Sequence, residues 1–344
     1  MAKLVARPGR SKASNRARRI VFPEKGVVKV EDFELGGPGP RQILVRTISS
    51  LISVGTELVD LHAKRLSGKR YPSYPGYANV SEIIEVGEEV EGFSAGERVY
   101  SQATHATHCL LDVEKDMVLK VPEAVPSSHA TFTTIAAVAL YGVREAGLTL
   151  GESVAIFGQG LVGALSLQFA KLAGAEPLIA IDLVDAKLAL ARQMGATHII
   201  NPQKENLEEA VREATKGKGA RVVIEAAGNP KTIPEAFKIA SQRGRIVVIG
   251  GLHGLISLDL FTEFQLKELT MLGRHQPRCP REETPLTPFT QIFNRELILN
   301  YLETGRLKVK ELISLEAPYR EAPEIYRRLS EPGSELVGVV LNYV

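Results

Sequence analysis

The chain has 344 residues, of which 44% are hydrophobic and 24% are charged, close to the averages of globular proteins. This length predicts two domains, each long enough to bury its own core. No apolar run approaches the roughly 20 residues that cross a bilayer, which excludes a membrane-spanning class and predicts no membrane partner. The only cysteines, Cys109 and Cys279, are too few for a disulfide framework or a cysteine metal cluster, and they favour a reducing cytoplasm.

The excess of positive charge comes from the start of the chain. Formal net charge is +2, yet the first twenty residues include no acid and these basic residues: Lys3, Arg7, Arg10, Lys12, Arg16, Arg18 and Arg19. Such a segment is typical of a targeting presequence, a nucleic-acid arm or a solvated arm. It has no apolar stretch of the kind found in secretory signals. We therefore expect residues 1–19 to form a solvated, poorly ordered tail without a nucleic-acid partner.

Short β segments separated by Gly and Pro fill the chain from residue 20 to about residue 122. The candidates are residues 20–22, 27–30, 42–47 and 79–86. Residues 85–99 then place apolar side chains between turns that contain Gly, as a small barrel wall requires. These features predict an all-β lobe.

An Ala-rich stretch at residues 130–143 predicts a buried helix that leads into a second domain. Strands that are apolar on both faces then alternate with helices, which predicts a doubly wound parallel sheet in an α/β domain. The predicted strands are 153–157, 178–181, 198–200, 222–224 and 246–249, and the helices are 161–172, 186–194, 207–214 and 234–240. Residues 246–251, followed by 256–258, are a candidate sheet edge for oligomer formation. Beyond residue 272, helices at 294–302 and 323–329 and a strand at 336–341 return the chain to the first lobe.

A glycine motif for dinucleotide binding directly follows the first strand of this sheet and begins a helix. It reads Gly158-Gln159-Gly160-Leu161-Val162-Gly163. The first glycine permits a tight turn, the second lets the backbone approach a pyrophosphate, and the third lets helix and strand pack closely. The next strand ends at Asp182, whose carboxylate can accept hydrogen bonds from ribose hydroxyls and would repel a 2′-phosphate. The motif therefore predicts NAD rather than NADP, with Lys187 near the same ribose.

Several further motifs occur in the order and spacing of one family. They are Val54-Gly55-Thr56-Glu57, Pro75-Gly76-Tyr77-Ala78, the turn series of residues 86–99, residues 137–143, the glycine motif and Glu225-Ala226-Ala227-Gly228. Over residues 20–344 the chain resembles the medium-chain alcohol and polyol dehydrogenases. The resemblance implies a GroES-like β-barrel catalytic domain at 20–136, a Rossmann domain at 137–274 and a return to the catalytic domain at 275–344. It also implies cofactor contacts from Ala227 and Gly250, and a homodimer or homotetramer.

The metal ligands of that family are missing from this sequence. The family holds its catalytic zinc with a Cys, a His or Glu, and a further Cys or acid. At the corresponding places this chain has Val54, Tyr77-Ala78, and Thr134 or Ile135, which do not make a tetrahedral zinc site. The four cysteines of the family's structural zinc are also missing. We therefore expect no zinc, and expect other groups to stabilise the oxygen that develops negative charge.

Hydroxyl and imidazole groups are the candidates for that role. Thr56 matches the family's residue that hydrogen-bonds the substrate oxygen. Tyr77 replaces a zinc ligand and either presents its phenol to the same oxygen or packs against Pro75. His105 and His108 have pKa values near neutrality as a residue type, so either is a candidate for proton exchange. A metal site built on this histidine pair is the less favoured alternative, because two imidazoles lack a supporting carboxylate or thiolate.

The neighbouring Glu57 is expected to hold its loop through backbone hydrogen bonds rather than to perform acid–base chemistry. The resulting prediction is a zinc-independent, NAD-dependent oxidoreductase that transfers a hydride between a secondary alcohol and its ketone, with a sugar, cyclitol or polyol as substrate. Two alternatives stay open: a quinone or enone reductase that uses NAD(P)H, and a nucleotide sensor that has lost catalysis.

Overall fold

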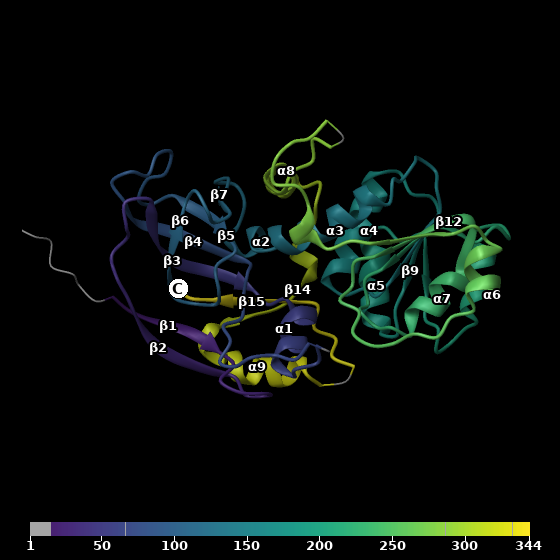
Figure 1. Cartoon of the computed structure of the whole chain (residues 1–344), viewed down its shortest axis with the longest axis horizontal. Helices are drawn as coiled ribbons and strands as arrows, with labels where there is room; N and C mark the ends of the chain where they lie inside the picture. Colours follow the sequence, from purple (N-terminus) through teal and green to yellow (C-terminus); the bar gives the residue numbers. More distant parts are fainter. Residues whose placement is uncertain (1–14, 66, 286, 332) are drawn as a thin grey trace, which may run out of the picture.

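The computed structural model describes residues 15–344 except residues 66, 286 and 332. Two lobes lie side by side, and helices α3 (Thr133–Glu145) and α8 (Gln291–Glu303) run between them (Figure 1). One lobe is built mainly of antiparallel strands and the other of a parallel sheet covered by helices. This arrangement confirms the predicted fold class, a mainly β lobe joined to a doubly wound α/β domain.

The second lobe contains a six-stranded parallel sheet with the order β10-β9-β8-β11-β12-β13. Its strands are β8 (Val154–Phe157), β9 (Leu178–Ile181), β10 (His198–Ile200), β11 (Ala220–Glu225), β12 (Ala240–Val248) and β13 (Thr270–Gly273). Its helices are α4 (Leu161–Leu172), α5 (Asp185–Met194), α6 (Leu207–Ala214) and α7 (Thr232–Ile239), with a π-helical turn η1 (Leu260–Gln265). The strand order reverses between β8 and β11, which is where ligands bind in sheets of this type.

The sheet edge differs from the sequence prediction. Residues 246–248 belong to β12, which has β11 on one side and β13 on the other, so they are internal. The edge strand is β13, four residues that are mostly exposed. The apolar pattern of β12 was read correctly as a strand, but the pattern alone does not say which strand comes last.

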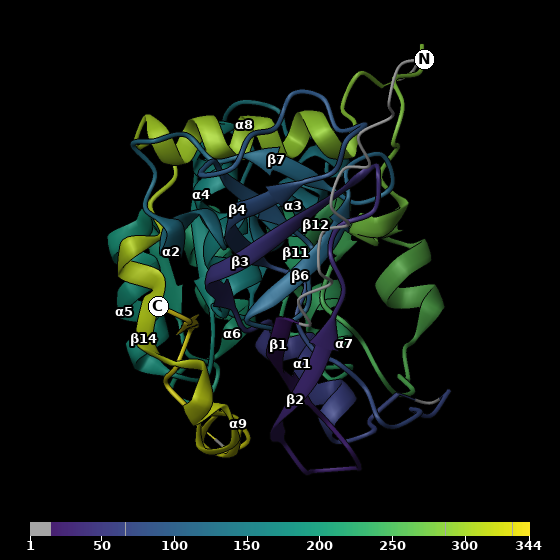
Figure 2. The ribbon, with the colours of Figure 1, turned by 90° about the vertical axis from the view of Figure 1, so that its left-hand side faces the viewer.

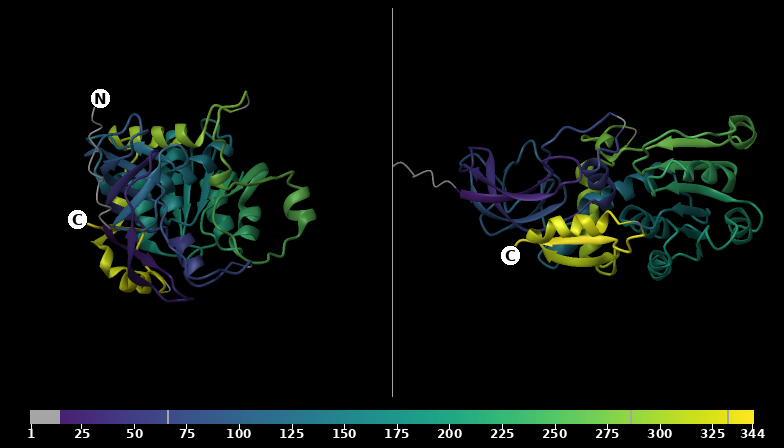
Figure 3. Two further views of the ribbon diagram at one scale, coloured as in Figure 1. Left: turned by 60° about the vertical axis from the view of Figure 1, so that its left-hand side comes forward. Right: turned by 90° about the horizontal axis from the view of Figure 1, so that it is seen from below.

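The first lobe contains a seven-stranded sheet with the order β14-β15-β3-β4-β5-β7, and β6 also pairs with β3. Its strands are β3 (Gln42–Leu51), β4 (Asn79–Val86), β5 (Arg98–Ser101), β6 (His108–Asp112), β7 (Val118–Lys120), β14 (Ile313–Pro318) and β15 (Gly338–Asn342). Its short helices are α1 (Val54–Leu61), α2 (Ser127–Ala130) and α9 (Ala322–Leu329), with 3-10 turns at Gln276–Arg278, Lys310–Leu312 and Tyr319–Glu321. Figure 2 shows α8 and α9 at opposite ends of this lobe, and Figure 3 shows the C-terminal α9 and β15 packed into it.

A strand replaces part of the predicted basic tail. Strand β1 (Asn15–Val21) pairs with β2 (Lys29–Leu35), so it begins inside the segment assigned to the tail. The arginines of β1 find acids across the ladder: Arg18 Nε donates to Asp32 at 2.8 Å, and Arg19 Nε donates to Glu31 at 2.8 Å. Because these are cross-strand pairs of opposite charge, the basic residues stabilise the strand pair, and this part of the predicted tail is not a solvated arm. The remainder of the predicted tail, residues 1–14, lies outside the described residues.

A helix also appears in the lobe that was predicted to be all β. Helix α1 carries the Val-Gly-Thr-Glu motif, and its Glu57 side chain accepts a hydrogen bond from the backbone N–H of Ser53 at 2.8 Å. This bond satisfies one of the amide groups that a helix leaves unpaired at its start. Thr56 and Glu57 therefore lie in the first turn of α1, which lies near the junction of the two lobes (Figure 1).

One hydrophobic core runs through both lobes. It joins Leu51 and Ala78 of the first lobe to Ile156 and Leu165 of the second, and the small side chains of α3 pack between them. Because the lobes share this core, α3 holds the end of β3 against the parallel sheet of the second lobe. Within the described part of the chain, no helix is long and apolar enough to cross a membrane.

Candidate active site at the junction of the lobes

The glycine motif forms a tight turn between β8 and α4. Gly158 has a φ of +83°, and a Cβ at this position would lie 2.6 Å from the Cα of Ala227. A Cβ on Gly163 would lie 1.7 Å from the carbonyl oxygen of Gly158, so only glycine lets helix and turn approach this closely. Gly160 precedes α4, and a Cβ there would meet nothing within 4 Å. The backbone at Gly160 is therefore open to a ligand.

The Asp182 carboxylate is held directly beside this turn. One carboxylate oxygen accepts from the backbone N–H of Gln159 at 2.6 Å, and the other accepts from Val184 N–H at 2.9 Å. Each carboxylate oxygen has two lone pairs, so both oxygens keep acceptor capacity for ribose hydroxyls. Leu161 and Val162 form the first turn of α4, and Lys187 lies in the first turn of α5. These predicted cofactor residues thus come together at the carboxyl ends of β8 and β9.

Glu225 organises the neighbouring strand end and was not among the predicted site residues. Its carboxylate accepts from the N–H groups of Ala227 at 3.0 Å and Gly228 at 2.9 Å and from the Thr232 hydroxyl at 2.9 Å. Burial raises the pKa of this carboxyl. Gly250 donates its N–H to the Glu225 carbonyl at 2.9 Å, and a Cβ on Gly250 would strike the Glu225 side chain. The acid therefore explains why Ala227 and Gly250 sit beside the glycine turn.

Three hydroxyl groups cluster around Tyr77, at positions that the sequence resemblance assigned to metal and substrate contacts. The Tyr77 hydroxyl is hydrogen-bonded to the hydroxyls of Ser53 and Thr56, the latter at 3.1 Å. Burial raises the pKa of Tyr77 above its usual value of 10. The Tyr77 phenol is therefore a neutral hydrogen-bond donor at physiological pH. Thr56 is exposed, so its hydroxyl is accessible to a substrate.

A buried network of side-chain hydrogen bonds supports this cluster. Glu57 accepts from the Tyr326 hydroxyl, and one of its oxygens lies 3.2 Å from His105 Nε2. His105 Nδ1 lies 2.7 Å from Ser50 Oγ, which in turn lies 3.1 Å from the Tyr343 hydroxyl. Burial, followed by the charge of Glu57, raises the pKa of Tyr326 well above its usual value. No local pattern identifies Tyr326 or Tyr343 as site residues, because they lie more than 250 residues from Glu57 and Ser50.

The two candidate histidines are in different surroundings. The side chain of His105 is completely buried in the network just described, and it packs directly beneath Gly76, where a Cβ would lie 2.5 Å from the His105 backbone nitrogen. His108 is half-buried at the start of β6, opposite Arg46 of β3. Its Nδ1 lies 3.1 Å from the hydroxyl of its neighbour Thr107. Burial, with a smaller contribution from Arg46, lowers the pKa of His108. The structure therefore brings Thr56, Tyr77 and His105 together but places His108 outside their hydrogen-bonded network.

The residues at the family's zinc positions do not fit zinc. Val54 and Ala78 have no ligand atom, and the Tyr77 phenol stays protonated. The Thr134 hydroxyl donates to the Tyr77 carbonyl at 2.8 Å, so it is already used. In the part of the chain that the structure describes, no three His, Cys, Asp or Glu side chains lie close enough to hold a metal ion. Zinc prefers thiolate, imidazole and carboxylate ligands, and this donor set offers none of them.

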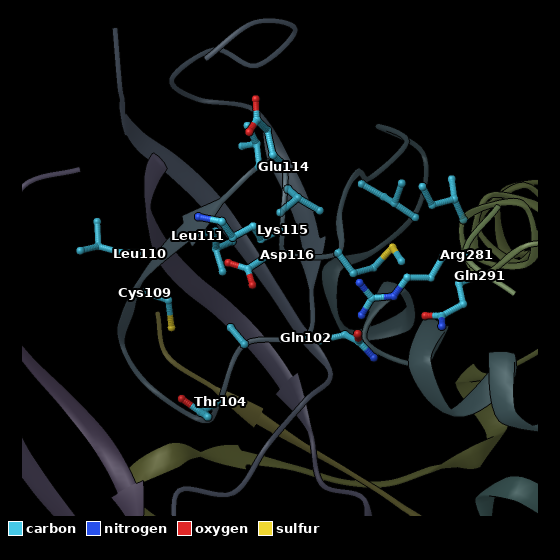
Figure 4. A pocket seen from close by; sticks show the side chains of 16 residues that line it. Gln102, Thr104, Cys109, Leu110, Leu111, Glu114, Lys115, Asp116, Arg281 and Gln291 are labelled. Carbon is cyan, nitrogen blue, oxygen red and sulfur yellow. The ribbon is translucent and has the colours of Figure 1, made fainter. Parts of the chain in front are cut away.

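A polar cavity of about 590 Å³ lies in the first lobe, between the β6–β7 turn and the start of α8 (Figure 4). Gln102, Thr104, Asp116, Arg281 and Gln291 contribute polar groups to its wall. One hydrogen bond links its wall to the start of β4: Asn79 donates its side-chain amide to the Thr104 carbonyl at 3.4 Å. The cavity offers hydrogen-bonding groups to a small hydrophilic molecule.

A Rossmann sheet with an acid beside its glycine turn, joined to a GroES-like lobe, defines an alcohol-dehydrogenase-like oxidoreductase. The alcohol dehydrogenase GroES-like domain matches residues 39–155, and the zinc-binding dehydrogenase family matches residues 162–291. An L-threonine 3-dehydrogenase from Symbiobacterium thermophilum is 31% identical over 266 residues, which are 68% of this chain and 75% of that protein. The chain belongs to the zinc-type medium-chain dehydrogenase superfamily, which confirms the resemblance seen in the sequence.

Two solved structures share the fold over almost their whole length. One is a protein from Sinorhizobium meliloti described as a zinc-binding dehydrogenase and bound to NADP, with a TM-score of 0.82 and 23% identity, covering 95% of this chain and 99% of that one. The other is galactitol-1-phosphate dehydrogenase from Escherichia coli, with a TM-score of 0.80 and 21% identity, covering 94% and 99%. At these identities the two structures support the fold rather than a particular substrate.

Proposed function

We propose that this protein catalyses zinc-independent hydride transfer between NAD(H) and a secondary alcohol or its ketone. The observation that carries the proposal is the cluster formed by the hydroxyls of Tyr77, Thr56 and Ser53. The sequence resemblance assigns Tyr77 to a zinc-ligand position and Thr56 to the residue that contacts the substrate oxygen, which supports this role. They can donate hydrogen bonds to an oxygen that gains negative charge, which is how preorganised donors stabilise such a transition state.

The nucleotide turn supports NAD over NADP. The Asp182 carboxylate is fixed by two backbone N–H groups and would repel the 2′-phosphate of NADP. When bound, the nicotinamide supplies the hydride for ketone reduction and accepts it in alcohol oxidation. During reduction the ketone oxygen must also gain a proton. Tyr77, held as a neutral phenol, and the exposed hydroxyl of Thr56 are placed to hold and deliver that proton, which water then replaces.

Positioning is the role we assign to His105 and Glu57. Both side chains are buried, and together they tie helix α1, which carries Thr56, to Tyr326 and to Ser50 of β3. The His108 side chain is hydrogen-bonded to its neighbour Thr107 rather than to this network, so we rank it below Thr56 and Tyr77 as a proton donor. The polar cavity near Gln102 and Thr104 supports a sugar, cyclitol or polyol as the substrate class. The two isolated cysteines support a cytoplasmic enzyme.

The test is a screen of polyols and sugars with NAD, comparing the wild type with Thr56→Val and Tyr77→Phe. We expect turnover by the wild type and a loss of about a hundredfold in kcat in each variant, the usual scale for removing one such donor. Thr304→Val is a suitable control, because its hydroxyl caps a carbonyl at the exposed end of α8. Turnover unaffected by both substitutions would refute the role of the cluster.

Two other measurements separate the alternatives. Elemental analysis of the active protein should find no stoichiometric zinc, and one zinc per chain would refute the metal-free proposal. NADH fluorescence should change at a much lower protein concentration than NADPH fluorescence. The reverse order, with activity on enones or quinones, would favour a reductase. NADH binding with no turnover of any substrate would favour a nucleotide sensor.

A further inference from the structure

The largest fully buried side chain of the described residues is a cation, Arg295 of α8. Its side chain lies at the junction of the lobes, and no carboxylate among the described residues forms an ion pair with it. A buried charge without a counter-ion is destabilising unless its donors are used in good hydrogen bonds. The hydrogen bonds that this guanidinium makes therefore require an explanation.

Arg295 donates to neutral oxygens only. Its Nη1 donates to the backbone carbonyl of Gln291 at 2.9 Å, one turn earlier in α8. The side-chain oxygen of Gln276, in the amide orientation that satisfies both groups, accepts from Nη1 and Nη2 at 3.1 Å each. Its Nε donates to the hydroxyl of Tyr100 on β5 at 3.3 Å. The last contact leads from α8 into the first lobe.

From Tyr100 the hydrogen bonds continue to the proposed active site. The Tyr100 hydroxyl lies 2.5 Å from Thr134 Oγ of α3, and the Thr134 hydroxyl donates to the Tyr77 carbonyl at 2.8 Å. A guanidinium can only donate and a carbonyl can only accept, and each hydroxyl has a single proton. The direction of every bond is thereby fixed: Arg295 donates to Tyr100, Tyr100 to Thr134, and Thr134 to the Tyr77 carbonyl.

We propose that Arg295 is a positioning residue that fixes Tyr77 through this one-way chain of hydrogen bonds. The proposal rests on the proposed function for its effect on catalysis. These hydrogen bonds join α8, β5, α3 and the loop before β4, so they reach Tyr77 through other elements than the network of Glu57 and His105. Thr134, one of the two residues that the sequence resemblance assigned to a zinc-ligand position, here holds the Tyr77 carbonyl. The chain also explains why a buried cation is retained without a carboxylate, since each bond polarises the next.

The experiment breaks the chain at its last bond and compares two substitutions of one residue. Thr134→Val removes the hydroxyl at nearly constant volume, and Thr134→Ser retains it. We expect Thr134→Val to lower kcat about tenfold while KM and NADH affinity stay within twofold, because small displacements at a reacting group reduce rate more than binding. Thr134→Ser should restore most of the rate. Thr304→Val, which removes a comparable hydroxyl-to-carbonyl bond at the C-terminal end of α8, is the matched control.

A second readout does not depend on turnover. With ¹³C label at the ring carbon that bears the tyrosine hydroxyl, the Tyr77 signal, assigned with Tyr77→Phe, should move in Thr134→Val and Tyr100→Phe but not in Thr304→Val. Combining Thr134→Val with Tyr100→Phe should lower kcat no further than the stronger single change, because both interrupt one chain. Arg295→Met removes the first donor and should move the Tyr77 signal as Tyr100→Phe does. If Arg295→Met fails to fold, Tyr100→Phe carries the test.

The outcomes separate the two proposals. A wild type that turns over substrate, with Thr134→Val indistinguishable from Thr304→Val in both kcat and the Tyr77 signal, would overturn the role of Arg295 alone. Multiplicative losses in the double variant would also overturn it. A wild type without turnover would refute the proposed function. The Tyr77 signal would still decide whether the hydrogen bonds from Arg295 position Tyr77.

Discussion

Asp182 is the residue on which cofactor choice depends most directly. Hydrogen bonds to a charged group contribute about 1.5–3 kcal/mol each, so Asp182→Asn should weaken NADH binding by roughly ten- to a hundredfold. NADPH binding should weaken less, because the repulsion of its phosphate is removed as well. Titration of NADH and NADPH fluorescence measures both effects.

Asp185 provides the control for that change, since it lies three residues later at the start of α5. Its carboxylate pairs with Lys204 and accepts from Asn201 rather than holding the glycine turn. Asp185→Asn should therefore leave the preference for NADH intact. Equal losses of NADH affinity in the two variants would mean that a general change of charge, rather than hydrogen bonding by Asp182, sets the preference for NADH.

Tyr326 links the buried network to alkaline stability. Its pKa is raised in the folded protein, whereas in the unfolded chain the phenol ionises near pH 10. The folded state therefore holds more protons above pH 10, so the free energy of unfolding is level below that pH and falls as pH rises further. One such tyrosine contributes a slope of about 1.4 kcal/mol per pH unit.

Urea denaturation between pH 8 and 11 measures this slope. Tyr326→Phe should be less stable at pH 8, because Glu57 loses a donor, yet it should lose stability less steeply above pH 10. Other titrating groups are common to both proteins and cancel in the comparison. Parallel curves above pH 10 would contradict the assignment.

At the scale of elements, the sequence predicted what depends on local patterns. The strands and helices around β8, β9 and β11 have clear periods, and the glycine motif lies at the predicted junction of strand and helix. Helix α1 was missed because it has only eight residues, includes Gly55, and is held by Glu57 contacts to Tyr326 and His105 from distant parts of the chain. The predicted strand at residues 20–22 found only the end of β1. Its charged first residues were missed because their charges are matched by acids on β2, which no local pattern reveals.

The β8–α4 junction yields a prediction that separates packing from binding. Gly163→Ala introduces a Cβ 1.7 Å from the Gly158 carbonyl oxygen, so it should destabilise the cofactor-free protein by several kcal/mol and abolish NADH binding. Gly160→Ala meets open space and leaves an ordinary φ of −71°. It should keep the thermal stability of the wild type.

Gly160→Ala should nevertheless weaken NADH binding at least tenfold, because its methyl group occupies the space through which the backbone approaches the pyrophosphate. Thermal denaturation without cofactor and fluorescence titration with NADH measure the two properties separately. If Gly160→Ala binds NADH as well as the wild type does, the pyrophosphate does not lie over this turn.

Over the whole molecule, the site is assembled from parts that are far apart in sequence. Tyr77 and Thr56 come from the first lobe, Thr134 from the linking helix, and Tyr326 and Tyr343 from the last twenty residues. Sequence motifs predicted Thr56 and Tyr77 because they stand at family positions. The supporting residues depend on the return of the chain to the first lobe, and no spacing or period identifies them in advance.

The exposed edge of the second lobe predicts a homodimer. Within the described residues, strand β13 has a free edge and exposes Met271. The segment leading to it exposes further large apolar side chains, namely Leu255, Ile256, Leu260, Phe261 and Leu266. Free strand edges and apolar patches of this kind are typical of association, and pairing of β13 with the same strand of a second copy about a two-fold axis would cover both.

Met271→Lys should therefore convert the dimer into a monomer, since pairing would place two like charges close to each other across the two-fold axis and leave them partly desolvated. Sedimentation at several protein concentrations measures the mass directly.

Leu150→Lys serves as the control, because Leu150 is 83% exposed in the turn before β8 and takes no part in this edge. A monomeric wild type, or a dimer that survives Met271→Lys, would mean that the apolar segment serves another purpose than self-association. A monomer produced only by Met271→Lys would locate the interface at β13, at the opposite side of the sheet from β10, and leave the nucleotide turn between β8 and α4 free in each copy.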